Sequence, residues 1–386
     1  MKTLLLGGAF NMQFGGAAYS DKFVFLRMRQ KAKMGGYFTL LNQEVAPDEL
    51  VGILDELPSI ATDVKEGTYD DVVTLFKGAE AETMKEDLYA FKNQYPNPVQ
   101  EAYDVMPKDW FLLLRLFFLK HEELKPAADA ILGGFATMLI DALSNSGRIE
   151  TIHEQIPFKV KTFMGRFDQL YTVNYDQNPE HLFSKKIVHL YGTFDDLMQS
   201  ETAAYDMQKA VIPDLLDELE DEVHVAGISV VRKGPLFEHL AGNEKLKKIV
   251  VYYSGEDEKQ MLEAHYDKKR FRLKSAKKLW EGMEDGGKRV EKKKLNTGRL
   301  GKLLEQANQY AESYLTEDEF LREYNQFTNA DITRFCRMIR EEMDAAGAET
   351  AVDEHILNEV YYLALQEGVL PAVFFMISFM HYDKIR

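Results

Sequence analysis

The stretch Thr3-Leu4-Leu5-Leu6-Gly7-Gly8 decides the class of fold that this sequence predicts. Its apolar run breaks directly into two glycines, and a buried strand followed by a tight turn accounts for both features. Ala9, Phe10 and Asn11 continue the stretch, and Gly15-Gly16 follow soon after. A strand that runs into small residues allows backbone N–H groups to approach a phosphate, although the first strand of any α/β domain has the same appearance.

Four later runs predict further strands, because they are rich in β-branched and aromatic residues and end in polar residues or glycine. They are Gln169–Asn174, Ile187–Tyr191, Glu222–Val231 and Lys248–Tyr253. Helical patterns fill the gaps between them, for example over Met198–Glu220. Strands that alternate with helices predict a parallel sheet with helices on both faces, and in such sheets ligands bind beyond the carboxyl ends of the strands.

Helical periodicity dominates the rest of the chain. Two of the expected helices are Trp110–Lys120 and Pro126–Leu143, and Thr316 and Thr328 each carry the signature of a helix start. The expected organisation is an α/β domain over 1–266 with a helical insertion at 45–150, a basic linker or helix at 267–297, and a helical C-terminal lobe at 298–386.

Composition and charge exclude several classes of protein. A chain of 386 residues, 45% of them hydrophobic, can bury a full core, so disorder is excluded as its main state. The single cysteine, Cys336, has no partner for a disulfide bond, is expected to be packed, and suits a reducing compartment. A net charge of −16 repels nucleic acid and anionic membranes on average.

The stretch Lys268–Lys294 departs from that acidic average. It holds twelve Lys or Arg and four acidic residues, which gives it a charge of +8 and leaves −24 on the rest of the chain. Tyr266, Phe271 and Trp280 are interleaved with these cations, as aromatic residues often are in nucleic-acid grooves. A solvated helix accounts for the same pattern and is the interpretation that we favour, so a nucleic acid is expected as a partner only through this stretch.

Membrane spans and metal sites are not expected either. The apolar run Trp110–Leu119 is interrupted by Arg115, and Val369–Met380 has twelve residues where about 20 are needed to cross a bilayer. The N-terminal apolar run is not followed by a secretory cleavage site, so we expect a cytoplasmic protein. The nine histidines show no spacing typical of a metal site.

Polar residues follow the second expected strand. Asn174 and Asp176 stand in the run Thr172-Val173-Asn174-Tyr175-Asp176, and Glu180 comes shortly after it. An Asn amide at the end of a strand can orient a water or a ribose hydroxyl, and carboxylates can accept hydrogen bonds from ribose. The alternative is an Asx turn that simply ends the strand.

Two other strand ends carry candidate groups. His189 alternates with Tyr191 along the third expected strand, so both are expected on one side, where His189 could act as a general base. A hydrogen-bonded packing residue is the alternative for His189. Gly227 follows the fourth expected strand, and Ser229 lies two residues further along the chain. A glycine at this position permits close backbone approach to a ligand. The alternative is a β-bulge.

Taken in this order, the four motifs resemble those of the phage abortive-infection AbiH family, which lies in the sirtuin-like branch of Rossmann-type folds. The motifs are Gly7-Gly8-Ala9-Phe10-Asn11, Asn174-Tyr175-Asp176 with Glu180, Tyr191-Gly192 and Gly227-Ile228-Ser229. The resemblance implies a Rossmann-type parallel sheet of the sirtuin-like kind. It also implies a bacterial anti-phage protein that binds NAD or an ADP-ribose-like nucleotide.

The resemblance further implies a role for each group. Gly7, Gly8, Phe10 and Asn11 would hold the pyrophosphate, with Gly227 and Ser229 in the same pocket. Asn174 would position the ribose or an attacking water, and Asp176 and Glu180 would support the ribose. In an active relative, cleavage of the nicotinamide–ribose bond would deplete NAD and arrest the infected cell.

The departures from the family pattern concern the polar and catalytic groups. Sirtuin-like enzymes place a His directly before the Gly, where this chain has Tyr191, and Tyr is a poor base at neutral pH. The Asp of the family's opening motif is Asn11 here, and the His of its Gly-His-Ser motif is Ile228. Two hypotheses follow. The first is an NAD-cleaving enzyme that uses Asn174 with His189 or Tyr191, and the second is a catalytically silent nucleotide-sensing or scaffold subunit of a defence complex or homo-oligomer.

Overall fold

The computed structural model describes residues 1–35, 45–121, 123–200, 213–230, 234–283, 295, 300–349 and 353–385. The chain divides into a first unit, Met1–Asp285, and a second unit, Gly286–Arg386. The division falls inside the segment 267–297, for which the sequence predicts a basic linker or helix. Residues 284–294 of that segment lie outside the described residues, so the second half of the basic stretch carries no structural conclusion.

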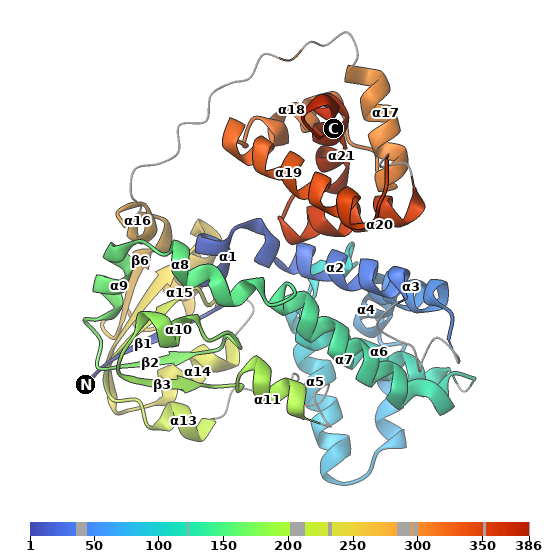
Figure 1. The fold of residues 1–386 in the computed structure, drawn as a ribbon. Helices are drawn as coiled ribbons and strands as arrows, with labels where there is room; N and C mark the ends of the chain where they lie inside the picture. Colours follow the sequence, from blue (N-terminus) through green and yellow to red (C-terminus); the bar gives the residue numbers. More distant parts are fainter. Residues whose placement is uncertain are drawn as a thin grey trace. The chain divides into compact units, whose positions relative to one another are not determined.

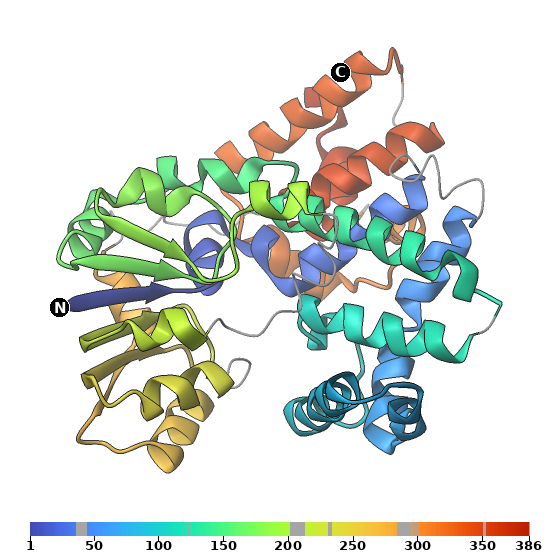
Figure 2. The same ribbon diagram turned by 90° about the horizontal axis from the view of Figure 1, so that it is seen from below.

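A six-stranded parallel sheet forms the centre of the first unit, in the order β3-β2-β1-β4-β5-β6 (Figure 1). Its strands are β1 (Lys2–Leu6), β2 (Gln169–Thr172), β3 (Lys186–His189), β4 (Asp221–Ala226), β5 (Leu246–Tyr253) and β6 (Phe271–Ser275). In the middle of the sheet, Leu5 of β1 lies opposite Tyr171 of β2 and Val225 of β4. Figure 2 shows this dark-blue strand between the green and the yellow strands. The predicted parallel α/β sheet is confirmed, and its strand order is the one found in Rossmann-type sheets.

Both faces of the sheet are covered, which explains why consecutive residues are buried in its central strands, Thr3–Leu6 in β1 and Val223–Ala226 in β4. Leu4 and Leu6 of β1 pack into a core on one face together with Phe10, whereas Leu5 packs into a separate core on the other face. The helices that connect or follow the later strands are α10 (Asn178–Leu182), α11 (Phe194–Gln199), α13 (Pro213–Asp217), α14 (Gly234–Gly242), α15 (Glu256–His265) and α16 (Ala276–Glu281).

Strand β6 corrects the sequence analysis, which places a linker or helix there. Phe271 is buried, whereas Arg272 and Lys274 are exposed, so the strand alternates between a buried and a solvated side. β6 pairs with β5 and lies at the edge of the sheet. Because charged residues are the usual protection of an edge strand, the cations that suggest a solvated helix belong in part to this strand.

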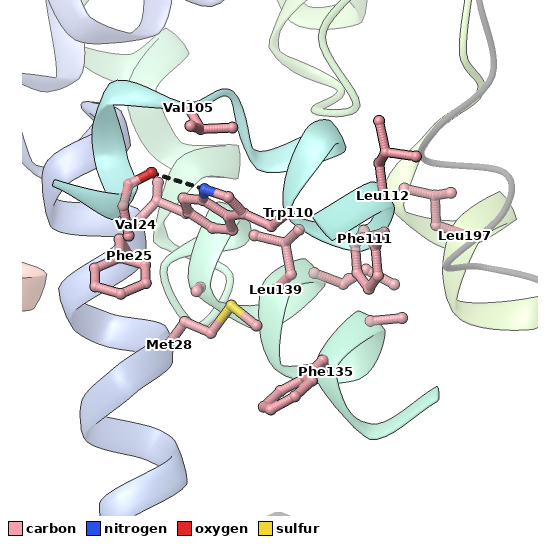
Figure 3. Packing of buried hydrophobic residues seen from close by; sticks show 14 of the residues in the cluster. Val24, Phe25, Met28, Val105, Trp110, Phe111, Leu112, Phe135, Leu139 and Leu197 are labelled. Carbon is pink, nitrogen blue, oxygen red and sulfur yellow. Dashed lines mark hydrogen bonds between the residues drawn. The ribbon is translucent and has the colours of Figure 1, made fainter. Parts of the chain in front are cut away.

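Helices fill the chain between β1 and β2, including the range 45–150 for which the sequence predicts a helical insertion. They are α1 (Ala9–Gly15), α2 (Asp21–Met34), α3 (Pro47–Asp55), α4 (Leu57–Glu66), α5 (Ala79–Gln94), α6 (Pro107–Lys120), α7 (Ala128–Ser144), α8 (Ile152–Gln155) and α9 (Phe158–Met164). Trp110 of α6 lies in the core of this insertion, 1% exposed (Figure 3). Its Nε1–H donates to the carbonyl of Ala102 at 2.9 Å, and its ring meets that of Phe25 edge-on.

The second unit is helical in its described part. Its helices are α17 (Leu300–Ala311), α18 (Glu317–Tyr324), α19 (Asn329–Ala345), α20 (Glu354–Gln366), α21 (Pro371–Met380) and α22 (Tyr382–Ile385). The two predicted helix starts are confirmed, because Thr316 and Thr328 each form a complete capping box, with Glu319 and Asp331 respectively. Cys336 is buried in the core of this unit, as the sequence predicts for a packed thiol.

One stretch in the described residues is long and apolar enough to cross a membrane, Lys125–Gln155, with 44% of its apolar window buried inside the structure. The pair Glu354–Gln366 and Pro371–Met380 has the composition of a span but is bent by 114°. Ile131, Phe135 and Leu139 of the first stretch belong to the core of the insertion. A helix that packs into a core has the same composition as a span, so this finding is weak evidence for a membrane segment.

Candidate functional site

A cleft of about 970 Å³ opens beyond the carboxyl ends of the strands in the first unit. Its walls include Gly8 and Ala9 after β1, Val173–Asp176 after β2, Tyr191 after β3, Gly227–Ser229 after β4, Ser254 after β5, and Ala276 and Lys277 after β6. Residues of the helices between β1 and β2 complete the walls, among them Lys22 of α2 and Lys108 of α6. This is the edge of a parallel sheet at which ligands bind, and the volume is that of a small-molecule site.

Glycines at the ends of β1 and β4 bring the two loops into direct contact. The Gly7 N–H donates to the carbonyl of Ala226 at 3.0 Å, and the Ala9 N–H donates to that of Gly227 at 3.1 Å. A Cβ on Gly7 would lie 2.4 Å from the Gly227 carbonyl oxygen, so this position admits only glycine. Gly227 itself has φ +75°, which favours glycine as well. The sequence predicts a close approach of the backbone to a ligand at these glycines. In the structure the close approach is between the loop after β1 and the loop after β4, which together form the floor of the cleft.

Gly8 has a different environment. It is exposed to the cleft, and a Cβ built on it would meet nothing nearer than Asn174 Oδ1 at 4.0 Å. Its φ of −57° is accessible to every residue type. A side chain at this position would therefore project into the space of the cleft without strain, which makes Gly8 the natural place to block it.

Asn11, Asp176 and Asn178 form a buried polar relay beside the cleft. Asn11 Nδ2 donates to Asp176 Oδ2 at 2.7 Å, and Asn178 donates to Asp176 Oδ1 through its backbone N–H at 3.1 Å and its Nδ2 at 2.6 Å. All three side chains are at most 5% exposed. Burial raises the pKa of the Asp176 carboxyl above its ordinary value, and the hydrogen bonds from Asn11 and Asn178 act in the opposite direction.

Asn174 lines the cleft and is 8% exposed. Its backbone N–H donates to Thr172 Oγ1 at 3.0 Å, and its Nδ2 lies 3.5 Å from the carbonyl oxygen of Gly7. The strand-end position that the sequence predicts for Asn174 thus places its amide against the loop after β1. The Asx turn in this motif is formed by Asp176, whose Oδ1 accepts from the Asn178 N–H, so both interpretations of the motif apply.

His189 is not placed as a base in the cleft. Its Nδ1 is 3.0 Å from the carbonyl oxygen of Asn174, and its Nε2 is 2.9 Å from Glu180 Oε1. Both His189 and Glu180 lie outside the lining of the cleft. The expectation that His189 and Tyr191 share one side requires a strand that continues to Tyr191, whereas β3 ends at His189. His189 therefore supports the loop of Asn174 from behind, which is the packing alternative.

Tyr191 does line the cleft, where its ring lies 6.4 Å from that of Tyr175. Burial raises the pKa of Tyr191, and it raises the pKa of Tyr175 to about 12. Both phenols therefore stay protonated at neutral pH. A protonated phenol can donate a hydrogen bond to a ligand, but it cannot accept a proton from one.

The structure brings together most of the residues that the sequence singles out. Those in the lining are Gly8, Asn11, Asn174, Asp176, Tyr191, Gly227 and Ser229. Phe10 is not among them, because it packs in the core against the rings of Phe14 and Trp280, at 4.9 and 5.9 Å between centroids. Trp280 does reach the cleft. Phe10 thus supports the wall of the cleft and lies away from its space.

Glu258 is a lining residue that the sequence analysis missed. It is 6% exposed, and it accepts hydrogen bonds from the Val230 N–H at 2.9 Å and from the backbone N–H and Oγ of Ser254 at 2.7 and 2.8 Å. It thereby fastens the loop after β4 to the loop after β5. Its sequence signal is an acidic residue in the first turn of the helix that follows a buried strand and a Ser-Gly pair.

A second cavity of about 970 Å³, here named the insertion cavity, lies among the helices of the first unit. The buried residues of its wall are Phe118, Leu132, Ala136, Ile140, Phe194 and Leu197. Gly133 of α7 also lines it, and a Cβ built there meets nothing within 4 Å. The two cavities have the same volume, and among their lining residues only Phe194 belongs to both.

Among the residues that the structure describes, no group of three or more His, Cys, Asp or Glu is placed to hold a metal ion. Comparison of the chain with protein-family models, curated proteins and solved structures finds no match in any of the three. The geometry of the cleft is therefore the basis for a functional assignment.

Proposed function

We propose that this chain binds a nucleotide of the NAD or ADP-ribose type in the cleft and acts as a nucleotide-sensing subunit in bacterial anti-phage defence. The observation that carries the proposal is the position of the cleft, whose floor is formed by the loops after β1 and β4. In the order β3-β2-β1-β4-β5-β6 this is the point where the direction of the strand order reverses, which is where dinucleotides bind in doubly wound sheets. The AbiH-like motifs, the sirtuin-like subtype and the cytoplasmic location are parts of the same proposal.

The walls supply groups that suit the parts of such a ligand. Lys22, Lys108 and Lys277 line the cleft and carry positive charge that suits phosphates. Lys108 also pairs with Asp109 at 3.1 Å and Lys277 with Glu281 at 3.7 Å. Gly8 leaves room for a pyrophosphate close to the backbone. The amide of Asn174 and the phenol of Tyr191 can hydrogen-bond to ribose hydroxyls. These residues fit NAD or ADP-ribose, whose phosphates, hydroxyls and rings need cations, polar groups and apolar surface respectively.

Sensing is a better fit to the geometry than cleavage. Of the two residues that the sequence offers as a base, His189 is engaged with Asn174 and Glu180 behind the cleft. Tyr191 is in the cleft but has a raised pKa, so it keeps its proton. Activation of a ribose hydroxyl or a water needs a base that lies at the ligand and can take a proton near neutral pH. His189 does not line the cleft, and Tyr191 keeps its proton.

The test is a thermal-shift measurement with NAD and with ADP-ribose on three proteins: the natural chain, Gly8→Leu and Gly133→Leu. A ligand at a hundredfold excess over its Kd stabilises the folded protein by about 2.7 kcal/mol. We expect the shift in the natural chain and in Gly133→Leu, which changes the insertion cavity, and its loss in Gly8→Leu, which fills the cleft.

No shift with either ligand in the natural chain, or an equal shift in Gly8→Leu, would contradict the proposal. An assay for nicotinamide release on the same samples separates the two hypotheses, because a sensor leaves NAD intact. Release that disappears in Gly8→Leu would instead establish the NAD-cleaving enzyme.

A further inference from the structure

The polar relay beside the cleft has a fixed hydrogen-bond direction. A backbone N–H can only donate, so the His153 N–H, 2.8 Å from Asn178 Oδ1, identifies that atom as the oxygen. The Nδ2 of Asn178 then donates to the carbonyl of Ile149 at 2.8 Å and to Asp176 Oδ1 at 2.6 Å. The orientation of the Asn178 amide is therefore determined by its surroundings.

The same kind of argument fixes the orientation of the Asn11 side-chain amide. An ionised carboxylate only accepts hydrogen bonds, and Asp176 Oδ2 is 2.7 Å from the amide of Asn11. Asn11 must therefore turn its Nδ2 toward Asp176, since the opposite orientation would bring two oxygens together. As a result its Oδ1 is directed away from Asp176.

Asn11 Oδ1 can accept a hydrogen bond that none of the described residues donates. Asn11 lines the cleft and is 5% exposed, and its Oδ1 is enclosed without a hydrogen-bond partner among the residues that the structure describes. Leaving a buried acceptor unsatisfied is unfavourable, and most such atoms in folded proteins have a partner. A ligand group that enters the cleft beside Asn11 can supply one, provided that it carries an N–H or an O–H.

We propose that Asn11 and Asp176 determine the ligand specificity of the cleft: they select a nucleotide that presents a hydrogen-bond donor to Asn11 Oδ1. This inference rests on the proposed nucleotide binding and specifies the ligand's chemistry. Asp176 acts as a positioning residue, because it fixes which end of the Asn11 amide is available. The donor is either a carboxamide N–H, present in NAD but not in ADP-ribose, or a group that both nucleotides carry, a sugar O–H or the adenine amino N–H.

The experiment uses two variants. The first reverses the hydrogen bond between residues 11 and 176, and the second restores an acceptor that faces the ligand. In Asp176→Asn, the new amide can still accept from Asn178 through its oxygen, but its NH₂ group faces Asn11 and needs an acceptor. Asn11 then turns its oxygen toward residue 176 and presents an N–H to the ligand. The double variant Asn11→Asp with Asp176→Asn exchanges the two side chains, so residue 176 donates to residue 11 and an acceptor is available again.

Binding of NAD and of ADP-ribose is measured by calorimetry on the natural chain and on both variants, after thermal unfolding has shown that each is folded. We expect the Kd to rise about tenfold in Asp176→Asn, the effect of one lost hydrogen bond, and to return to within a few-fold of the natural value in the double variant. A rise limited to NAD identifies the carboxamide as the donor, and a rise for both ligands identifies a group that they share, a sugar hydroxyl or the adenine amino group.

Unchanged affinity in Asp176→Asn would overturn this inference alone, and so would a folded double variant that fails to recover. A natural chain that binds neither nucleotide would overturn the proposed function and this inference together. Recovery of affinity in the double variant distinguishes a positioning role from general damage to the fold, because the double variant still carries Asp176→Asn.

Discussion

The cleft and the insertion cavity have the same volume of about 970 Å³, yet their buried walls differ in chemistry. The buried wall of the cleft contains the polar side chains of Asn11, Asn174, Asp176 and Glu258. The buried residues of the insertion cavity are all apolar. Charged residues also line the insertion cavity, among them Arg115, Asp129 and Asp141, but none of these three is fully buried. A buried hydrogen-bonded network fixes the orientation of its polar groups, whereas buried apolar residues follow from the packing of helices. Wall chemistry, more than volume, indicates which cavity recognises a ligand.

The largest expected effect comes from the wall of the insertion cavity. Phe118 is 2% exposed, and Phe118→Ala should lower the free energy of unfolding by about 3–5 kcal/mol because it removes a buried ring. Nucleotide affinity of the folded protein should not change. Denaturant unfolding and calorimetry check the two parts, with Phe158→Ala as the matched control, since Phe158 is 79% exposed. A large change in affinity would mean that the two cavities are coupled.

A smaller effect is expected at the floor of the cleft. Gly7→Ala places a Cβ 2.3 Å from Ile228 Cγ1 and 2.4 Å from the Gly227 carbonyl oxygen, which should destabilise the fold by about 1–3 kcal/mol through overpacking. Gly8→Ala is the matched control, because the neighbouring glycine has room for a methyl group. Equal unfolding midpoints for the two variants would show that the loops after β1 and β4 separate easily.

The smallest effect concerns pH. The pKa of Asp176 is raised by burial, so the stability that this group contributes is fully present below its ordinary pKa of about 3.9 and is lost as pH rises through the folded-state value. Relative to Asp176→Asn, the natural chain should therefore lose stability as the pH rises above about 4. Unfolding curves of both proteins from about pH 4 upward measure the difference. A difference that stays constant, or grows with pH, would contradict the burial that sets the cleft apart from the insertion cavity.

The sheet was largely predictable because its inner strands are buried on both faces. Runs such as Thr3–Leu6 and Lys248–Tyr253 stand out by composition alone. β6 was not predicted, since an edge strand buries only one side and Arg272 and Lys274 obscure its alternation. Local patterns thus indicate strands well where the surroundings are uniformly apolar, and poorly at an edge.

Site residues were predictable from the sequence only where they directly follow a strand. Asn174 and Asp176 follow β2 directly, and both lie in the cleft. Glu258 was missed because its partners lie on two different loops, and the polar relay because Asn11 and Asp176 are 165 residues apart. For His189 the sequence left two roles open, a base and a packing residue, because it does not show that β3 ends at His189.

The position of β1 at the centre of the sheet has a consequence for how the chain folds during synthesis. Thr3 of β1 pairs with Gln169 of β2, 166 residues later, and Lys2 pairs with Glu222 of β4. At about 5–20 residues per second, the first strand waits roughly 10 to 30 seconds for its first partner. The helices of the insertion can form on the ribosome in that interval, because their contacts are more local. The leucines of β1 meanwhile stay exposed, which makes this short segment a natural target for a chaperone that holds nascent chains.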